Sequence, residues 1–325
     1  MPAQLLEVAD LSVRFDTDDG PVHAVDKLSF TLASGQSLGI VGESGCGKSV
    51  TCLSLVRLLP ETAVISGRVV LDGVDLLALT APQLRGVRGA EIAYVFQEPA
   101  TSLNPVFTVG RQVGEVLRRH LGLSRREARV RTIELLRLVR IPAAEHRLDD
   151  YPHQLSGGMR QRVMIAMALA CDPKVLIADE PTTALDVTIQ AGILDLMRDI
   201  QDRLGTAIII VSHDLGVVAD IADRVLVMYA GRKAEEAPAA DLFGEPQHPY
   251  TIGLLGAIPR TLGSGNARKR LREIPGRVAP VRELATRCAF ADRCARADEL
   301  SWTEVPELRT VRPGHLVACF HPGPE

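Results

Sequence analysis

A glycine-rich segment, Gly42-Glu43-Ser44-Gly45-Cys46-Gly47-Lys48-Ser49, constrains the fold of this chain more than any other feature. The short apolar stretch Ser37–Val41 runs into it and predicts a buried strand. A helical pattern, Lys48–Leu59, follows and stops before Pro60. In a strand–loop–helix of this kind, backbone N–H groups converge on a phosphate at the N-terminus of the helix. The segment therefore predicts a nucleotide site.

Within this loop, each residue type has a defined chemical use. Lys48 supplies a cation for the β- and γ-phosphates, and Ser49 offers its hydroxyl to Mg²⁺. Cys46 occupies a position that any small residue can fill, so we interpret it as a buried filler rather than a redox thiol. The loop by itself is compatible with many classes of ATP- and GTP-using proteins.

Two adjacent acids follow a second buried strand and narrow the chemistry. Val175–Ala178 is apolar and is followed directly by Asp179 and Glu180. Such a strand can deliver Asp179 to magnesium and place Glu180 beside the attacking water. An apolar strand followed by two acids is common on its own, but a complete phosphate loop upstream and His213 downstream make the hydrolysis hypothesis strong.

The pattern of strands and helices predicts an α/β fold with parallel strands. We expect further buried strands at Ala93–Phe96, Ala207–Val211 and Arg224–Tyr229, and an antiparallel hairpin from Leu5–Phe15 and Val25–Leu32. Residues 98–172 have a helical pattern, with a capping box of Ser124 and Glu127. Their many arginines alternate with acids and lack aromatic partners, which favours a solvated helix surface over a nucleic-acid surface.

Composition and charge exclude several classes and suggest two domains. The net charge of −3 gives no general attraction to nucleic acid. No apolar run approaches the ~20 residues that span a bilayer, and the start of the chain lacks the pattern of a signal peptide, so we expect a cytoplasmic protein. Frequent prolines mark a change after Arg232. We predict a nucleotide-binding domain at 1–235, with its helical subdomain at about 98–172, and an irregular extension at 236–325.

A pentapeptide, Leu155-Ser156-Gly157-Gly158-Met159, makes the chain resemble the ATP-binding subunits of ABC transporters over nearly its whole length. The family pattern most often ends in Gln where this chain has Met159. The resemblance implies a RecA-like phosphate-loop core with an antiparallel β subdomain and a helical subdomain. It also implies that Gln97 contacts magnesium or water, that His213 stabilises the γ-phosphate, and that Phe15 stacks on adenine. Ala184-Leu185-Asp186 is similar to the family's D-loop.

The resemblance implies a dimer that traps two ATP molecules, each between the phosphate loop of one subunit and the signature pentapeptide of the other. Glu180, His213 and Gln97 are the implied catalytic residues, and Ser49, Gln97 and Asp179 the implied magnesium ligands. The residues expected to contact the nucleotide are Phe15, Gly42, Glu43, Ser44, Gly45, Cys46, Gly47, Lys48, Ser49, Val50, Ser156, Gly157, Gly158, Met159 and Asp186.

The C-terminal part is similar to ATPases of dipeptide and oligopeptide importers, on the residues His248-Pro249-Tyr250-Thr251 and Ile274-Pro275-Gly276. Ser102-Leu103-Asn104-Pro105 belongs to the same pattern. This implies a peripheral protein on the cytoplasmic face of the membrane, with a paralogous second ATPase, two permease subunits and, indirectly, a solute-binding protein. Nickel importers share part of this pattern and stay an alternative, as does a soluble ABC-type ATPase that acts on nucleic acid.

Three cysteines of the extension, Cys288, Cys294 and Cys319, raise the question of a metal. Relatives in this branch often hold an iron–sulfur cluster on four cysteines. Ser301 stands where we expect the remaining cysteine. A [4Fe–4S] cluster with an unusual fourth ligand, a three-iron cluster, zinc and simple thiols are all open alternatives.

Overall fold

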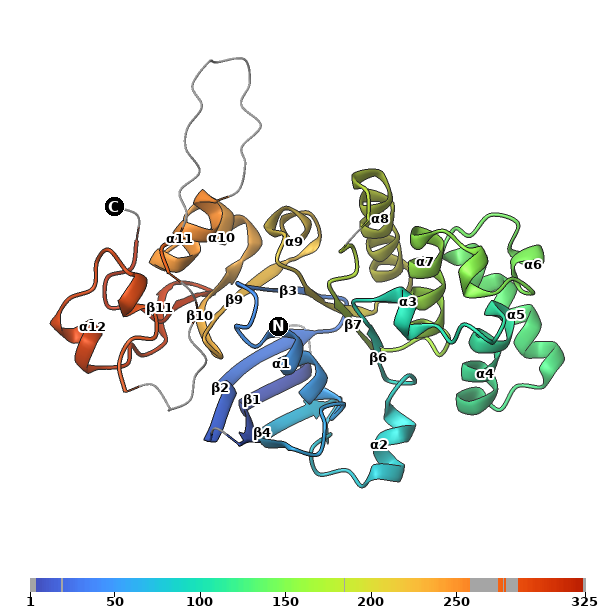
Figure 1. Ribbon diagram of the computed structural model, residues 1–325, viewed down its shortest axis with the longest axis horizontal. Coiled ribbons are helices and arrows are strands. Elements are labelled where there is room, and N and C mark those ends of the chain that lie inside the picture. The colour runs from blue at the N-terminus through green and yellow to red at the C-terminus, as the bar shows by residue number, and fades with distance from the viewer. Residues whose placement is uncertain are drawn as a thin grey trace, which may run out of the picture. The chain divides into compact units, whose positions relative to one another are not determined.

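The computed structural model describes residues 4–18, 20–183, 185–257, 274–276, 278 and 286–323, whose helices and strands are labelled in Figure 1. The chain divides into two compact units. The first unit comprises Met1–Leu6, Leu32–Ser37 and Val70–Val211, and the second comprises Glu7–Thr31, Leu38–Val69 and Ser212–Glu325. In the described ranges, no helix combines the length and the apolar character needed to cross a bilayer.

The first unit contains three parallel strands, β6 (Ile92–Val95), β7 (Val175–Asp179) and β8 (Ala207–Val211). All residues of β7 and β8 are buried, as expected for apolar runs in the middle of a parallel sheet. β6 ends at Val95, one residue before the predicted end, and the side chain of Phe96 is 43% exposed. The short strand β5 (Val74–Asp75) also lies in this unit.

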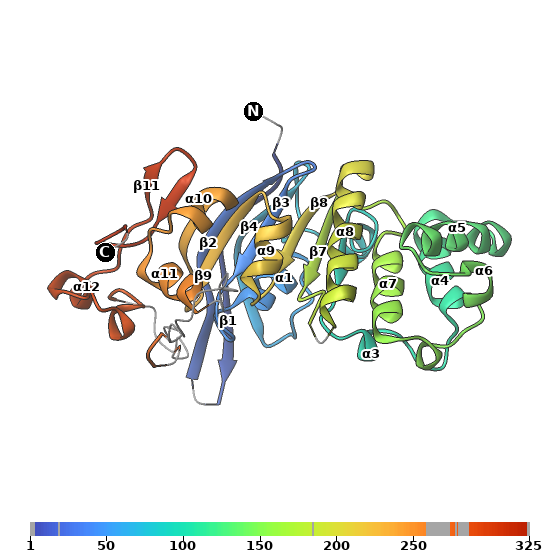
Figure 2. The same ribbon diagram turned by 90° about the horizontal axis from the view of Figure 1, so that it is seen from above.

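Helices form the remainder of the first unit, and the predicted capping box is present. Its Ser124 Oγ accepts from the N–H of Glu127 at 3.3 Å, and Glu127 Oε2 accepts from the N–H of Ser124 at 2.8 Å. Contacts join α4, α5 and α7, which Figure 2 shows side by side. The helices are α2 (Ala81–Val87), α3 (Pro99–Ser102), α4 (Val109–Leu121), α5 (Arg125–Leu138), α6 (Ala144–Arg147), η1 (Pro152–Gln154), α7 (Gly157–Ala168) and α8 (Val187–Leu204).

The second unit contains β3 (Ser37–Val41), which lies parallel to β9 (Arg224–Tyr229). β9 pairs antiparallel with β10 (Arg232–Pro238). β10 in turn pairs with β12 (His315–Val317), and β12 with β11 (Arg309–Arg312). The N-terminal strands β1 (Gln4–Thr17), β2 (Gly20–Ala33) and β4 (Ala63–Leu71) are neighbours in the order β2-β1-β4, which agrees with the expected hairpin.

The helices of the second unit are α1 (Lys48–Leu55), α9 (Leu215–Ile221), α10 (Ala239–Gly244), α11 (Pro249–Gly256), η2 (Ala291–Arg293) and α12 (Glu299–Thr303). The predicted helix Lys48–Leu59 is too long, because α1 stops at Leu55. Arg57 has a left-handed backbone with φ 51°, and the N–H of Leu58 bonds to the carbonyl of Leu53 at 2.9 Å. This turn, rather than Pro60, ends the helix.

The extension is more regular than predicted, because two of its strands, β11 and β12, continue the sheet beyond β10. The apolar side chains of β9 and β10 pack against α10, α11 and the segment around Phe290 in one core cluster. The predicted boundary between residues 235 and 236 falls inside β10. That boundary stays a prediction.

Candidate active site

Two glycines of the phosphate loop occupy positions that no larger residue could fill. Gly42 has φ 150°, and a Cβ there would lie 2.4 Å from the carbonyl oxygen of Met228. Gly47 caps α1 with φ 103°, and a Cβ there would lie 2.4 Å from the carbonyl oxygen of Ala24. Since both obstacles are backbone atoms, neither can move aside. The glycine spacing thus reflects close packing of the loop between β2 and β9.

Backbone carbonyls of the phosphate loop hold the side chain of Lys48. Its side chain is buried, and Nζ donates to the carbonyl of Gly42 at 2.7 Å and to that of Glu43 at 3.0 Å. Cys46 is fully buried, and burial raises the pKa of its thiol even though Lys48 opposes the shift. A neutral thiol agrees with the interpretation of Cys46 as a small filler. Ser49 follows on the first turn of α1 and is partly buried.

In the first unit, the two acids at the end of β7, Asp179 and Glu180, have separate hydrogen-bond partners. Asp179 ends the strand, and its Oδ2 accepts from the hydroxyl of Tyr94 at 2.8 Å. Glu180 Oε2 accepts from Gln97 Nε2 at 2.8 Å and from Thr183 Oγ1 at 2.8 Å. The structure therefore brings Gln97 to Glu180, as a pair that bonds directly. The Glu180 carboxylate is fixed by two donors.

Glu180 also has an unusual backbone. Its φ of 47° is left-handed, which side chains with a Cβ rarely adopt. The N–H of Glu180 bonds to the carbonyl of Val211 at 2.9 Å, so the end of β8 holds this conformation. Such residues cost on the order of 1–3 kcal/mol and occur preferentially at functional sites.

Tyr94 and Thr183 are site residues that our sequence analysis missed. Tyr94 lies on β6 opposite Ile177 of the parallel strand β7, and only this register brings its hydroxyl to the end of β7. Thr183 lies three residues after Glu180, where a hydroxyl alone predicts nothing specific. Parallel pairing of β6 and β7 was the one sequence signal that could have indicated Tyr94.

The signature pentapeptide forms the start of α7. Ser156 caps this helix, with its Oγ accepting from the N–H of Met159 at 3.3 Å. The predicted helix Arg160–Ala170 was wrong at its start, because this cap lets helix begin at Gly157. A Cβ on Gly158 would lie 2.6 Å from Cγ2 of Ile189 in α8, so the glycine permits close packing of α7 on α8. Ser156 and Gly157 are exposed.

The other predicted site residues lie at the ends of elements. Asp186 caps α8, with Oδ1 accepting from the N–H of Ile189 at 2.9 Å. His213 is exposed and follows β8, and Phe15 lies partly buried on β1. Ala184 lies outside the described residues. The roles predicted for Asp186, His213 and Phe15 stay predictions.

The three cysteines of the extension are partly buried free thiols. Burial, with smaller contributions from Cys288 and Cys294, raises the pKa of the Cys319 thiol to about 11. Ser301 Oγ donates to Asp298 Oδ1 at 2.8 Å and takes part in the cap of α12. Among the described residues, no three His, Cys, Asp or Glu side chains are placed to hold a metal ion.

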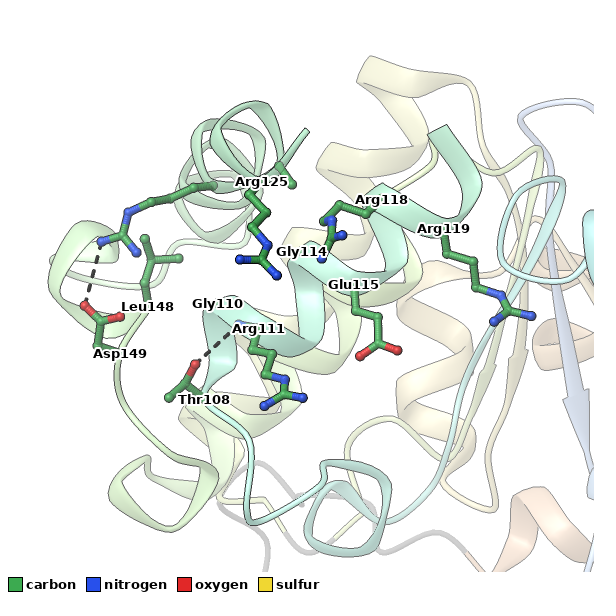
Figure 3. A pocket seen from close by; sticks show the side chains of 12 residues that line it. Thr108, Gly110, Arg111, Gly114, Glu115, Arg118, Arg119, Arg125, Leu148 and Asp149 are labelled. Atoms are coloured by element: carbon green, nitrogen blue, oxygen red, sulfur yellow. Dashed lines mark hydrogen bonds and ion pairs between the residues drawn. The ribbon is translucent and has the colours of Figure 1, made fainter. Parts of the chain in front are cut away.

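The helical part of the first unit also has a basic pocket of about 840 Å³, between α4 and α5. Figure 3 shows the arginines of both helices along this hollow. Two acids, Glu115 and Asp149, lie among them, and Asp149 pairs with Arg129 at 3.7 Å. The arginines are Arg111, Arg118, Arg119, Arg125 and Arg129. Mixed charge on exposed helices agrees with the predicted solvated surface.

Comparisons with known proteins place the chain in a family. The ABC transporter family model matches residues 25–183, and the model of the oligopeptide/dipeptide transporter C-terminal region matches residues 234–299. The probable peptide ABC transporter ATP-binding protein y4tR of Sinorhizobium fredii is 52% identical, over 97% of this chain and 94% of the relative. The oligopeptide transport ATP-binding protein OppD of Salmonella typhimurium is 50% identical, over 98% of this chain and 94% of the relative.

A solved structure supports the fold. A dimeric ATP-binding cassette in a post-hydrolysis state, bound to ADP and Pi, is 28% identical, with a TM-score of 0.65 over 72% of this chain and 98% of that chain. The predicted fold class and family resemblance are both confirmed. This chain belongs to the ATP-binding proteins of the ABC transporter family, in the group that carries the oligopeptide/dipeptide transporter C-terminal region.

Proposed function

We propose that this chain hydrolyses ATP to power a peptide importer whose transmembrane channel is formed by separate permease subunits. The observation that carries the proposal is Glu180, held by Gln97 and Thr183 directly after Asp179, in a chain with a complete phosphate loop. Relatives named for peptide transport, at about half identity over nearly the full length, support the peptide cargo. A nickel importer is the alternative cargo.

The phosphate loop would bind the phosphates of ATP. Its backbone N–H groups and the Lys48 ammonium would hold the β- and γ-phosphates, for which Lys48 leaves the carbonyls of Gly42 and Glu43. Ser49, Asp179 and Gln97 offer the oxygen ligands that Mg²⁺ prefers, and the bound metal would offset the phosphate charge. Phe15 would stack on the adenine ring.

In hydrolysis, the oxygen of water forms a bond to the γ-phosphorus, and the bond to the bridging oxygen of ADP breaks. Glu180 orients this water and accepts its proton, which returns to the released phosphate. Gln97 and Thr183 keep the carboxylate in one rotamer for this task. His213 would stabilise the charge on the γ-phosphate in the transition state.

Exposure of the signature supports a second ATPase subunit. Ser156 and Gly157 are exposed at the N-terminus of α7, and Val187, next to Asp186, is 82% exposed. We infer that these residues meet the phosphate loop of a partner ATPase, a paralogue of this chain, while two permease subunits hold both at the cytoplasmic face of the membrane. A solute-binding protein would deliver the peptide to the permeases.

The first test replaces Glu180 with Gln. We expect Glu180→Gln to retain ATP binding and to lose at least about a hundredfold in phosphate release, the usual contribution of a general base. Glu134→Gln is the control, because Glu134 is an exposed helix residue paired with Arg131. Lys48→Ala should instead weaken ATP binding itself. Wild-type phosphate release by Glu180→Gln would refute the proposal.

The iron–sulfur cluster has weaker support than ATP and magnesium. Three cysteines within the C-terminal region favour it, whereas the engaged Ser301 and the placement of the described His, Cys, Asp and Glu side chains oppose it. No step of the proposed cycle uses a cluster.

A further inference from the structure

The acidic residue of the phosphate loop, Glu43, is bound by the C-terminal part of the chain. Arg293 Nη1 donates to Glu43 Oε2 at 2.6 Å, and Arg293 Nη2 donates to Glu43 Oε1 at 3.0 Å. The hydroxyl of Tyr250 accepts from the N–H of Glu43 at 2.7 Å. With Lys48 on its carbonyl, Glu43 is contacted at its side chain, its N–H and its carbonyl oxygen.

Both partners of Glu43 are rigidly packed. The side chain of Arg293 is 4% exposed, and its Nε donates to the carbonyl of Pro275 at 2.6 Å. Tyr250 is fully buried and packs edge-on against Tyr229, with ring centroids 4.7 Å apart. A planar guanidinium with two parallel bonds to a carboxylate fixes geometry as well as charge. These contacts therefore constrain the loop.

The charge of Glu43 explains why such a constraint matters. A carboxylate within a phosphate loop repels the polyphosphate that the loop binds, and it is 32% exposed, so water screens it incompletely. The guanidinium of Arg293, which comes 250 residues after Glu43 in the sequence, neutralises the charge of this carboxylate. The Tyr250 hydroxyl accepts a hydrogen bond from the N–H of Glu43, so this peptide group keeps one orientation.

We propose that Arg293 and Tyr250 are positioning residues through which the C-terminal extension sets the affinity of the phosphate loop for ATP. Arg293 cancels the repulsion from Glu43, and Tyr250 fixes the peptide group at the entrance of the loop. The proposal rests on the proposed function, because it assigns a controlling element to the same ATP site. It gives the extension a part in ATP binding.

The test measures equilibrium binding of a fluorescent ATP analogue to the full chain, with magnesium present. We expect Arg293→Gln to weaken binding about tenfold, and Tyr250→Phe about threefold. The double variant Glu43→Gln/Arg293→Gln should recover most of the affinity, because it removes the repelling charge without restoring the ion pair. Arg293→Lys should retain part of the affinity, and higher salt should reduce the defect of Arg293→Gln.

Arg287→Gln is the matched control, because Arg287 pairs with Asp292 in the same extension at an exposed site. It should bind like the wild type. Binding by Arg293→Gln within twofold of wild type overturns the inference, and so does a defect that persists in the double variant. If Arg293→Gln does not fold, Tyr250→Phe and Arg293→Lys carry the test, and wild-type binding by both overturns it. A wild-type chain that binds no ATP refutes the proposed function instead.

Discussion

A buried histidine of the extension should make the stability of this protein depend on pH. His248 is 4% exposed, and its Nδ1 accepts from the N–H of Tyr250 at 3.0 Å, which caps α11. Burial lowers the pKa of His248 to about 4 from its ordinary 6.5. The folded protein therefore keeps this histidine neutral at pH values where the unfolded chain protonates it. Asn at this position would keep a capping oxygen and remove the titration.

The magnitude follows from the two pKa values. Because the folded pKa lies below the unfolded one, stability is complete above pH 6.5 and decreases as the pH falls toward 4. The unfolded chain gains protons across this range while the folded one does not. The loss is about 1.4 kcal/mol at pH 5.5 and about 2.5 kcal/mol at pH 4.5. Losses of this size are a large part of the total stability of a typical domain.

The assay is urea unfolding followed by the fluorescence of Trp302, the single tryptophan, which lies in the extension. Wild type and His248→Asn are compared at pH 7.5, 5.5 and 4.5. The free energy of unfolding should fall less steeply with acid in His248→Asn, by the amounts given above. His153→Asn is the control, because His153 is an exposed histidine outside the extension. Equal pH slopes for wild type and His248→Asn would refute the reasoning.

Two further predictions concern the signature helix and the cysteines. Gly158→Ala should lower the free energy of unfolding by about 1–3 kcal/mol, because its Cβ would lie 2.6 Å from Cγ2 of the stiff Ile189 side chain. The double variant Gly158→Ala/Ile189→Ala should lack this clash. If thermal unfolding shows that the two single losses of stability simply add in the double variant, the packing argument is wrong. Iron and sulfide analysis after anaerobic purification should find neither element, since Ser301 is engaged and no three His, Cys, Asp or Glu side chains of the described residues are placed to hold a metal ion. Stoichiometric iron would contradict this.

Much of the fold could be predicted because its strands are short apolar runs with clear ends. The predicted spans of β8 and β9 agree with the structure at both ends. Helix ends were less predictable, because they depend on caps and turns. Ser156 starts α7 three residues before the predicted start, and the left-handed Arg57 ends α1 before Pro60 is reached.

The site residues that form a motif could be predicted, whereas their supporting partners could not. Gln97 and Glu180 were both expected, and the structure joins them directly. Tyr94 and Arg293 belong to no sequence motif, because each reaches its acid through tertiary structure. Tyr94 depends on strand register, and Arg293 depends on a segment that lies 250 residues beyond Glu43.

The His248–Thr251 segment, which lies within the matched C-terminal region, also has a physical task in this chain. His248 caps α11 through its ring nitrogen, and Pro249 occupies the first helical position, where its missing N–H costs nothing. The N–H groups of Gln247 and His248 bond to the buried carboxylate of Glu235, at 2.7 and 2.9 Å, which ties the start of α11 to β10. These constraints fix the direction in which Tyr250 leaves the helix and thus bring its hydroxyl to the N–H of Glu43. Protonation of His248, which the folded protein resists down to about pH 4, would therefore loosen the same contact that orders the phosphate loop.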